Sequence, residues 1–302
     1  MKAGKAALGI VVGWAAWRVF GPETAPRYAP GQHRPSRVTG RTVLVGEREL
    51  FVREAGPTDG PPLVLVHGWG FDGEMNYHKV IEPLAKHFRV VVPDHRNHGK
   101  SDWIRGKYDV ADLADELAGV LDAIGVGRAA FVGYSLGGMV VQELARRYPG
   151  RVERMVLAAT AARPVQIARP LARVGMWLAR SIARVSTQEI AAASSRLMMR
   201  AGALHPWHHR WMRASLLRRD PTLFYEAGHA AWRFDSRSWV GKLDQPTLVI
   251  LTERDQIVLP RTQQELASLM PDAEIVELPG AGHESILSRP EEYVDIIKRF
   301  VG

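Results

Sequence analysis

The 302-residue chain contains no cysteine, which excludes disulfide bonds, a thiol nucleophile and a zinc site held by thiolates. Long apolar runs are also scarce. The segment that most suggests a membrane anchor, residues 6–17, has 12 residues, whereas a spanning helix needs about 20. The remaining composition, 46% hydrophobic and 24% charged, is ordinary for a globular protein and excludes a disordered, collagen-like or coiled-coil chain.

The N-terminal 37 residues differ from the rest of the chain. Lys2 and Lys5 precede the apolar segment, and Arg18 follows it. Residues 1–20 therefore indicate an uncleaved anchor or interfacial helix, a cleaved signal, or an arm packed on the protein. The first interpretation favours a membrane-associated or cell-envelope location, with a cytoplasmic location as the alternative. Residues 21–37 contain four prolines and predict an extended linker.

From residue 38 onward, short apolar runs alternate with segments of helical periodicity. Runs of β-branched residues that end in glycine or polar residues are typical of buried parallel strands. We expect strands at residues 41–44, 49–53, 63–66, 90–92, 129–132, 155–159, 247–251 and 274–278, and helices at 111–124, 136–148, 260–270 and 290–300. Repeated β-then-α units predict an α/β fold with a mostly parallel central sheet flanked by helices. We call residues 38–162 and 243–302 the body.

Residues 163–242, here called the insert, interrupt this alternation with helical periodicity and no convincing strand. They contain 14 Arg or Lys against four Asp or Glu, a net charge of +10 that leaves −2 for the rest of the chain. The arginines favour either an anionic membrane surface or simple solvation. The aromatic and methionine side chains of the insert suit an apolar substrate group. We expect no nucleic-acid partner and no metal site, because neither has a supporting motif.

The sequence Gly-Tyr-Ser-Leu-Gly at residues 133–137 follows an expected strand and opens an expected helix. Gly-x-Ser-x-Gly alone is a weak signal, but the strand–turn–helix context strengthens it. A sharp turn there raises the Ser135 hydroxyl above the sheet, and the flanking glycines let strand and helix approach closely. We therefore predict Ser135 as a catalytic nucleophile.

A serine hydroxyl needs a base to accept its proton, and the base needs a third group to orient it. His283 follows the expected strand at residues 274–278, in a glycine-containing loop. Asp255 follows the expected strand at residues 247–251, and Glu253 is the rival acid. We predict His283 as the base and Asp255 as its orienting acid.

The segment His-Gly-Trp-Gly at residues 67–70 comes directly after the expected strand at residues 63–66. An acyl-transfer intermediate carries an oxyanion that needs two preorganised N–H donors. The backbone N–H groups of Trp69 and Leu136 are the expected pair. We expect His67 to brace the loop rather than to act in catalysis.

These elements, in this order and spacing, resemble the α/β-hydrolase fold superfamily in its serine esterase and lipase-like branch. The turn Asp-His-Arg-Asn-His-Gly-Lys-Ser-Asp at residues 94–102 is similar to the Asp-x-Arg-x-x-Gly-x-Ser turn of small esterases. That turn is usually architectural. The family places a helical lid between the sixth and seventh strands, which implies that the insert is an all-helical basic lid.

The resemblance implies a cofactor-free serine hydrolase that cleaves small carboxylic esters of apolar character through an acyl-enzyme. The same scaffold leaves open the hydrolysis of an amide, a lactone or the C–C bond of a dione. A distant alternative is an inactive, membrane-associated binding protein whose basic insert is the working surface. The oligomeric state is not predicted.

Overall fold

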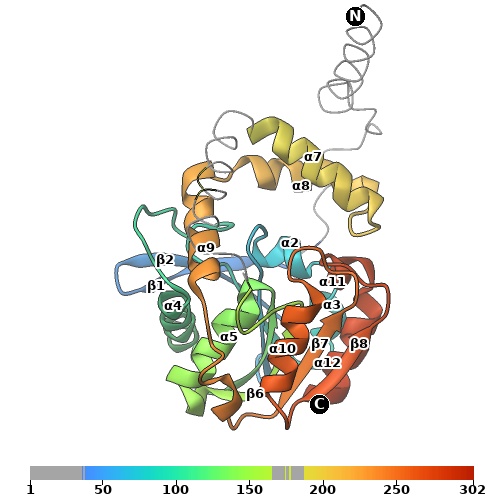
Figure 1. Cartoon of the computed structure of the whole chain (residues 1–302). Coiled ribbons are helices and arrows are strands. Elements are labelled where there is room, and N and C mark those ends of the chain that lie inside the picture. Colours follow the sequence, from blue (N-terminus) through green and yellow to red (C-terminus); the bar gives the residue numbers. More distant parts are fainter. Residues whose placement is uncertain (1–35, 37, 165–173, 175–176, 178–186) are drawn as a thin grey trace, which may run out of the picture.

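The computed structural model describes residues 36, 38–164, 174, 177 and 187–302 (Figure 1). The predictions for residues 1–20, for nearly all of the linker and for the arginine-rich start of the insert lie outside these ranges and stay predictions. Among the described residues, no helix is both long enough and apolar enough to cross a membrane.

An eight-stranded sheet forms the centre of the body. Its strands are β1 (Gly40–Val45), β2 (Arg48–Ala55), β3 (Pro62–Val66), β4 (Arg89–Pro93), β5 (Ala129–Tyr134), β6 (Val152–Ala158), β7 (Thr247–Thr252) and β8 (Glu274–Leu278). The spatial order is β1-β2-β4-β3-β5-β6-β7-β8. β1 pairs with β2, and β2 with β4, in antiparallel fashion, whereas every other neighbouring pair is parallel. The predicted mostly parallel sheet is confirmed.

Helices cover both faces of this sheet (Figure 1). The long helices of the body match the sequence-based expectations within a few residues. They are α4 (Val110–Ala123), α5 (Leu136–Arg147), α10 (Pro260–Leu269) and α12 (Pro290–Val301). The sequence did not predict the short helices α2 (Gly73–Tyr77), α3 (Ile81–Leu84) and α11 (Ser285–Ser288), because four or five residues carry no readable periodicity.

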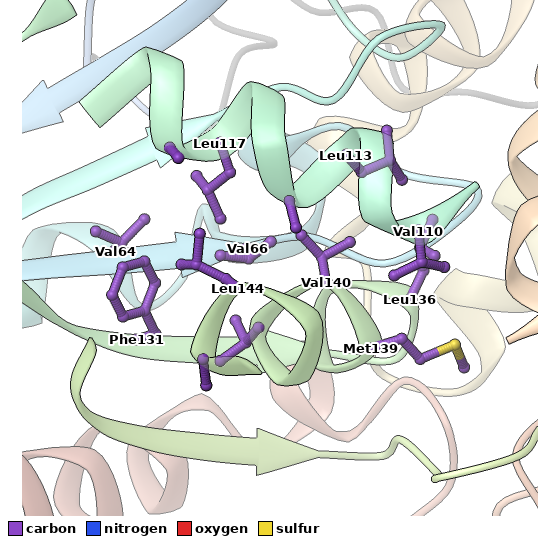
Figure 2. Close-up of a cluster of buried hydrophobic side chains, with 14 of the residues drawn as sticks. Val64, Val66, Val110, Leu113, Leu117, Phe131, Leu136, Met139, Val140 and Leu144 are labelled. Atoms are coloured by element: carbon purple, nitrogen blue, oxygen red, sulfur yellow. The ribbon is translucent and has the colours of Figure 1, made fainter. Parts of the chain in front are cut away.

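Side-chain alternation along the central strands explains the two layers of core. On β3, Val64 and Val66 belong to one cluster and Leu63 and Leu65 to the other, since successive side chains of a strand point to opposite faces. Figure 2 shows the first cluster, in which Val64, Val66 and Phe131 of the sheet lie against the apolar faces of α4 and α5. This packing fixes the start of α5 against the end of β5.

The described part of the insert, between β6 and β7, is helical. It contains α7 (Thr187–Arg200), α8 (His209–Leu217) and α9 (Pro221–Arg233), and a 3₁₀ turn, Val240–Lys242, leads back to the sheet. In Figure 1, α7 and α8 lie over α2. Met212 and Leu216 of α8 pack with Met75 of α2 in a small cluster of buried residues. The insert therefore contacts the edge of the sheet at which β3 ends.

Candidate active site

The turn between β5 and α5 holds Ser135 in an unusual backbone conformation. Ser135 has φ 54° and ψ −119°, a region that residues other than glycine rarely adopt. The glycines on either side make the close approach possible. A Cβ on Gly137 would lie 1.9 Å from the Val66 carbonyl oxygen, and one on Gly133 would lie 2.6 Å from the Gly138 Cα. The geometry is that of a strained strand-to-helix turn with the serine at its apex.

The end of β6 and the segment after it hold this turn in place. The Ser135 N–H donates to the Ala158 carbonyl at 2.9 Å, and the Thr160 hydroxyl donates to the Ser135 carbonyl at 2.7 Å. Strained backbone persists where the surrounding structure over-determines it, and it concentrates at functional sites. Ser135 is also the residue from which α5 begins, so its side chain lies at a helix N-terminus.

The loops after β7 and β8 bring Asp255 and His283 together. His283 Nδ1 lies 2.7 Å from Asp255 Oδ2. A carboxylate only accepts hydrogen bonds, so Nδ1 carries the proton and donates, which leaves Nε2 unprotonated and able to accept one. The rival acid Glu253 does not take this place, since its carboxylate accepts the Gly280 N–H.

Asp255 is buried, and both of its oxygens are fully used. Oδ1 accepts the N–H groups of Ile257 and Val258 at 2.8 and 2.9 Å. Oδ2 accepts the Thr252 hydroxyl at 3.0 Å and the Gln263 side-chain amide at 3.3 Å, besides His283. A buried carboxylate with this many donors keeps one orientation. No sequence motif pointed to Gln263, which reaches the site from α10.

A hydrogen bond also ties the His283 loop to the serine turn. Tyr134, the residue before Ser135, donates its hydroxyl to the His283 carbonyl at 2.6 Å, and the two rings lie 5.8 Å apart. Among the described residues, no hydrogen bond joins the Ser135 hydroxyl to the His283 ring. Such bonds are often long without substrate and tighten only in the reacting complex. The Tyr134 hydroxyl has a pKa raised well above its usual value by burial, so it stays a donor.

The loop after β3 lies directly against Ser135. A Cβ on Gly68 would lie 3.1 Å from the Ser135 Cβ. The Gly68 N–H donates to the Asn76 side chain at 2.9 Å, which fixes the loop and leaves the next N–H, that of Trp69, for another acceptor. The Leu136 N–H is the first of α5 and has no acceptor inside the helix. The two residues predicted to hold an oxyanion therefore follow directly after Gly68 and Ser135, and their role stays a prediction.

Behind this loop lie three neutral histidines. The rings of His67, His95 and His98 pack against one another in tilted and edge-on arrangements, with centroids 4.3 to 6.2 Å apart. His67 Nε2 accepts the His95 N–H at 3.0 Å, and burial lowers the pKa of His67 well below 6.5. Burial likewise lowers the pKa of His95 to about 3 and that of His98 to about 4. His67 thus braces the loop, as expected.

The turn at residues 94–102 is part of the same support. The Asp94 carboxylate accepts Arg53 Nη1 at 2.7 Å and the Gly73 N–H at 2.9 Å. The Ser101 hydroxyl donates to the Asp94 carbonyl at 2.7 Å. These contacts join β2, the turn and α2. In the described part of the chain, no group of three or more His, Asp or Glu side chains is arranged to hold a metal ion.

The comparisons with known proteins agree with this architecture. A family model described as the alpha/beta hydrolase fold matches residues 61–290. A pimeloyl-[acyl-carrier protein] methyl ester esterase of Chromobacterium violaceum is 31% identical over 256 residues, 81% of this chain and 95% of that protein. A putative carbamate hydrolase of Serratia proteamaculans is 27% identical over 255 residues, 78% of this chain and 89% of that protein. The solved structure of the enol-lactonase from Burkholderia xenovorans LB400 gives a TM-score of 0.75 at 29% identity, with 86% of this chain and 99% of that chain covered.

Proposed function

The chain belongs to the α/β-hydrolase fold family, and from this premise we propose that it is a serine hydrolase of small carboxylic esters with an apolar acyl or alcohol part. The observation that supports the proposal most is the 2.7 Å contact between His283 Nδ1 and Asp255, beside a serine in strained geometry. An esterase is among the relatives that cover most of the chain, which favours ester substrates.

In the first half-reaction the Ser135 hydroxyl attacks the ester carbonyl while His283 Nε2 takes its proton. Asp255 keeps His283 in the tautomer that has Nε2 free, and it stabilises the imidazolium that forms. The backbone N–H groups of Trp69 and Leu136 hold the oxyanion of the tetrahedral intermediate. Loss of one such donor typically costs about 3 to 4 kcal/mol of barrier. His283 then gives its proton to the leaving alcohol, and an acyl-enzyme remains on Ser135.

The second half-reaction repeats these roles with water. His283 Nε2 accepts a proton from a water molecule, which attacks the acyl carbonyl, and the proton returns to Ser135 as the acid leaves. The same steps open a lactone or cleave a carbamate, the chemistry that the names of the similar enol-lactonase and carbamate hydrolase state for those proteins. Esters, lactones and carbamates therefore belong in one substrate panel.

The test is release of p-nitrophenol from short and medium acyl esters by the wild type and by Ser135→Ala. We expect clear turnover by the wild type and a loss of at least about a thousandfold in the variant, with unchanged circular dichroism. Turnover by the variant close to that of the wild type would refute the assignment of Ser135.

A further inference from the structure

One arginine at the contact between insert and body has no counterion among the residues that the structure describes. Arg219 lies between α8 and α9, and its Nη2 contacts the Met75 sulfur at 3.6 Å. Its Cζ lies 5.2 Å from the centre of the Phe224 ring. A thioether is a weak acceptor. In the part of the chain that the structure describes, no carboxylate oxygen lies within 4.0 Å of this guanidinium.

Other arginines of the insert do have partners. Arg233 forms an ion pair with Asp109, and Arg237 with Asp235. Arg218, the neighbour of Arg219 in the sequence, is exposed and donates to the Ser215 hydroxyl at 3.0 Å. Arg219 therefore differs from Arg233 and Arg237 in its lack of an ion pair, and from Arg218 in its lower solvent exposure.

Arg219 is deep in the molecule and still reached by solvent. Burial lowers the pKa of Arg219 to about 10, and the charge of Asp72 opposes this effect. The residue nevertheless keeps an intermediate solvent exposure. Asp72 is a poor counterion, because its carboxylate already accepts the Met75 N–H at the start of α2 and its charge also acts on Arg53. A partly buried cation in this setting has lost much of its hydration, which a bound anion would compensate.

The position of Arg219 connects it with the proposed reaction centre. Phe224, under the guanidinium, stacks on Trp69 with ring centres 4.9 Å apart, and the Trp69 indole donates to the Phe224 carbonyl at 2.8 Å. Trp69 follows Gly68, which touches Ser135. His98 adds a second unsatisfied group, since its Nε2 is buried without a hydrogen-bond partner and its ring lies 6.4 Å from Phe224.

We propose that Arg219 binds a carboxylate carried by the ester substrate, at the end of the acyl group remote from the scissile bond. The two parallel N–H groups of a guanidinium match the two oxygens of a carboxylate. His98 lies beside the same ring and borders the place of the bound anion. This inference rests on the proposed ester hydrolysis and narrows its substrate to the half-esters of dicarboxylic acids.

The test compares p-nitrophenyl monoesters of the dicarboxylic acids from succinic to suberic with neutral p-nitrophenyl esters of equal chain length. For at least one chain length we expect the anionic ester to have the higher kcat/KM. Arg219→Met should lower kcat/KM for that ester at least about tenfold, mainly through KM, and leave the neutral ester within about twofold. Arg219→Lys, which keeps the charge, should retain part of the preference. Arg218→Met is the matched control and should behave as the wild type.

Two results would overturn the proposal. Equal losses of Arg219→Met on anionic and neutral esters would show that Arg219 only holds the insert on the body. Anionic esters that are never preferred would show that no carboxylate subsite exists.

A measurement without turnover separates this inference from the proposed function. Calorimetry of suberate with Ser135→Ala, which keeps the site and lacks the nucleophile, should show binding that disappears when Arg219→Met is added. Binding that survives the second substitution would contradict the role of Arg219, whatever the enzyme hydrolyses.

Discussion

Two arginines lie near the start of α2, and their surroundings differ. Arg53 of β2 is almost fully buried and pairs with Asp94 at 2.7 Å and with Glu74 at 3.7 Å. Burial alone would lower the pKa of Arg53, but the charges of Asp94, Asp72 and Glu74 raise it above its usual value. Arg219 of the insert has no such set, and burial lowers its pKa to about 10.

The difference separates a charged residue that stabilises the fold from one that can bind a ligand. A buried charge whose partners all belong to the protein fixes the backbone around it, as Arg53 and Asp94 fix the turn at residues 94–102. A buried charge that the protein leaves unpaired is explained by an anion from outside. Asp255 belongs to the first kind, because donors on three sides hold it, and Arg219 belongs to the second. His98 is neutral rather than charged, but its buried Nε2 also lacks a hydrogen-bond partner.

The largest expected effect comes from a substitution at Asp255, whose partners all belong to the protein. Asp255→Asn keeps the size of the side chain but presents an amide to His283, which favours the wrong tautomer. We expect kcat for p-nitrophenyl esters to fall about 1,000- to 10,000-fold. Some stability is lost as well, because the amide turns N–H groups toward donors that the carboxylate accepted. Glu253→Gln is the matched control, and we expect it to stay within about threefold of the wild type. A larger loss in the control than in Asp255→Asn would assign the acid to Glu253.

A smaller effect, on the free energy of unfolding, is expected from His98, whose buried Nε2 has no hydrogen-bond partner. Burial lowers the pKa of His98 to about 4, whereas an unfolded histidine titrates near 6.5. Between these values the unfolded chain binds a proton that the folded chain does not, so the free energy of unfolding falls as the pH falls. The loss attributable to His98 reaches about 3 kcal/mol near pH 4.

Urea denaturation from pH 7 to pH 4.5 measures this dependence. His98→Gln should flatten it, although His67 and His95 keep some of the slope in the variant. The exposed His87 is the matched site, and His87→Gln should leave the slope unchanged. Identical slopes in the wild type and in His98→Gln would mean that His98 is not held neutral.

The smallest effect is expected from a substitution at Gln263, one of the residues that hold Asp255. Gln263→Glu replaces the amide that donates to Asp255 Oδ2 and to the Val258 carbonyl with an acceptor. We expect kcat/KM to fall about tenfold. The added negative charge also favours the imidazolium of His283, so the acidic limb of the pH profile should move up by about one unit.

The neighbouring and exposed Gln264 provides the control for this substitution. Gln264→Glu makes the same change of charge one position along α10 and should leave both rate and profile unchanged. If Gln263→Glu lowers the rate but leaves the pH profile unchanged, Gln263 only packs against its neighbours.

The sequence predicted the order of the body's main elements, because β-branched runs and helical periodicity determine them locally. The positions of Ser135, Asp255 and His283 could be read from turns that follow buried strands, and the structure brings the last two into contact. Their catalytic roles, with those of Trp69 and Leu136, stay predictions. Gln263, Tyr134 and Asn76 could not be found, since each acts through a contact between residues distant in the chain. In the sequence Arg219 is only one of many arginines, because its lack of a counterion depends on how the chain folds.

The central claim is that Ser135 is a nucleophile activated by His283. Labelling of the native protein with a fluorophosphonate, followed by mass spectrometry of its peptides, tests this claim most directly. We expect one adduct, on Ser135, whose formation is lost in His283→Ala. An adduct on another serine, no adduct on the native protein, or full labelling of His283→Ala would contradict it.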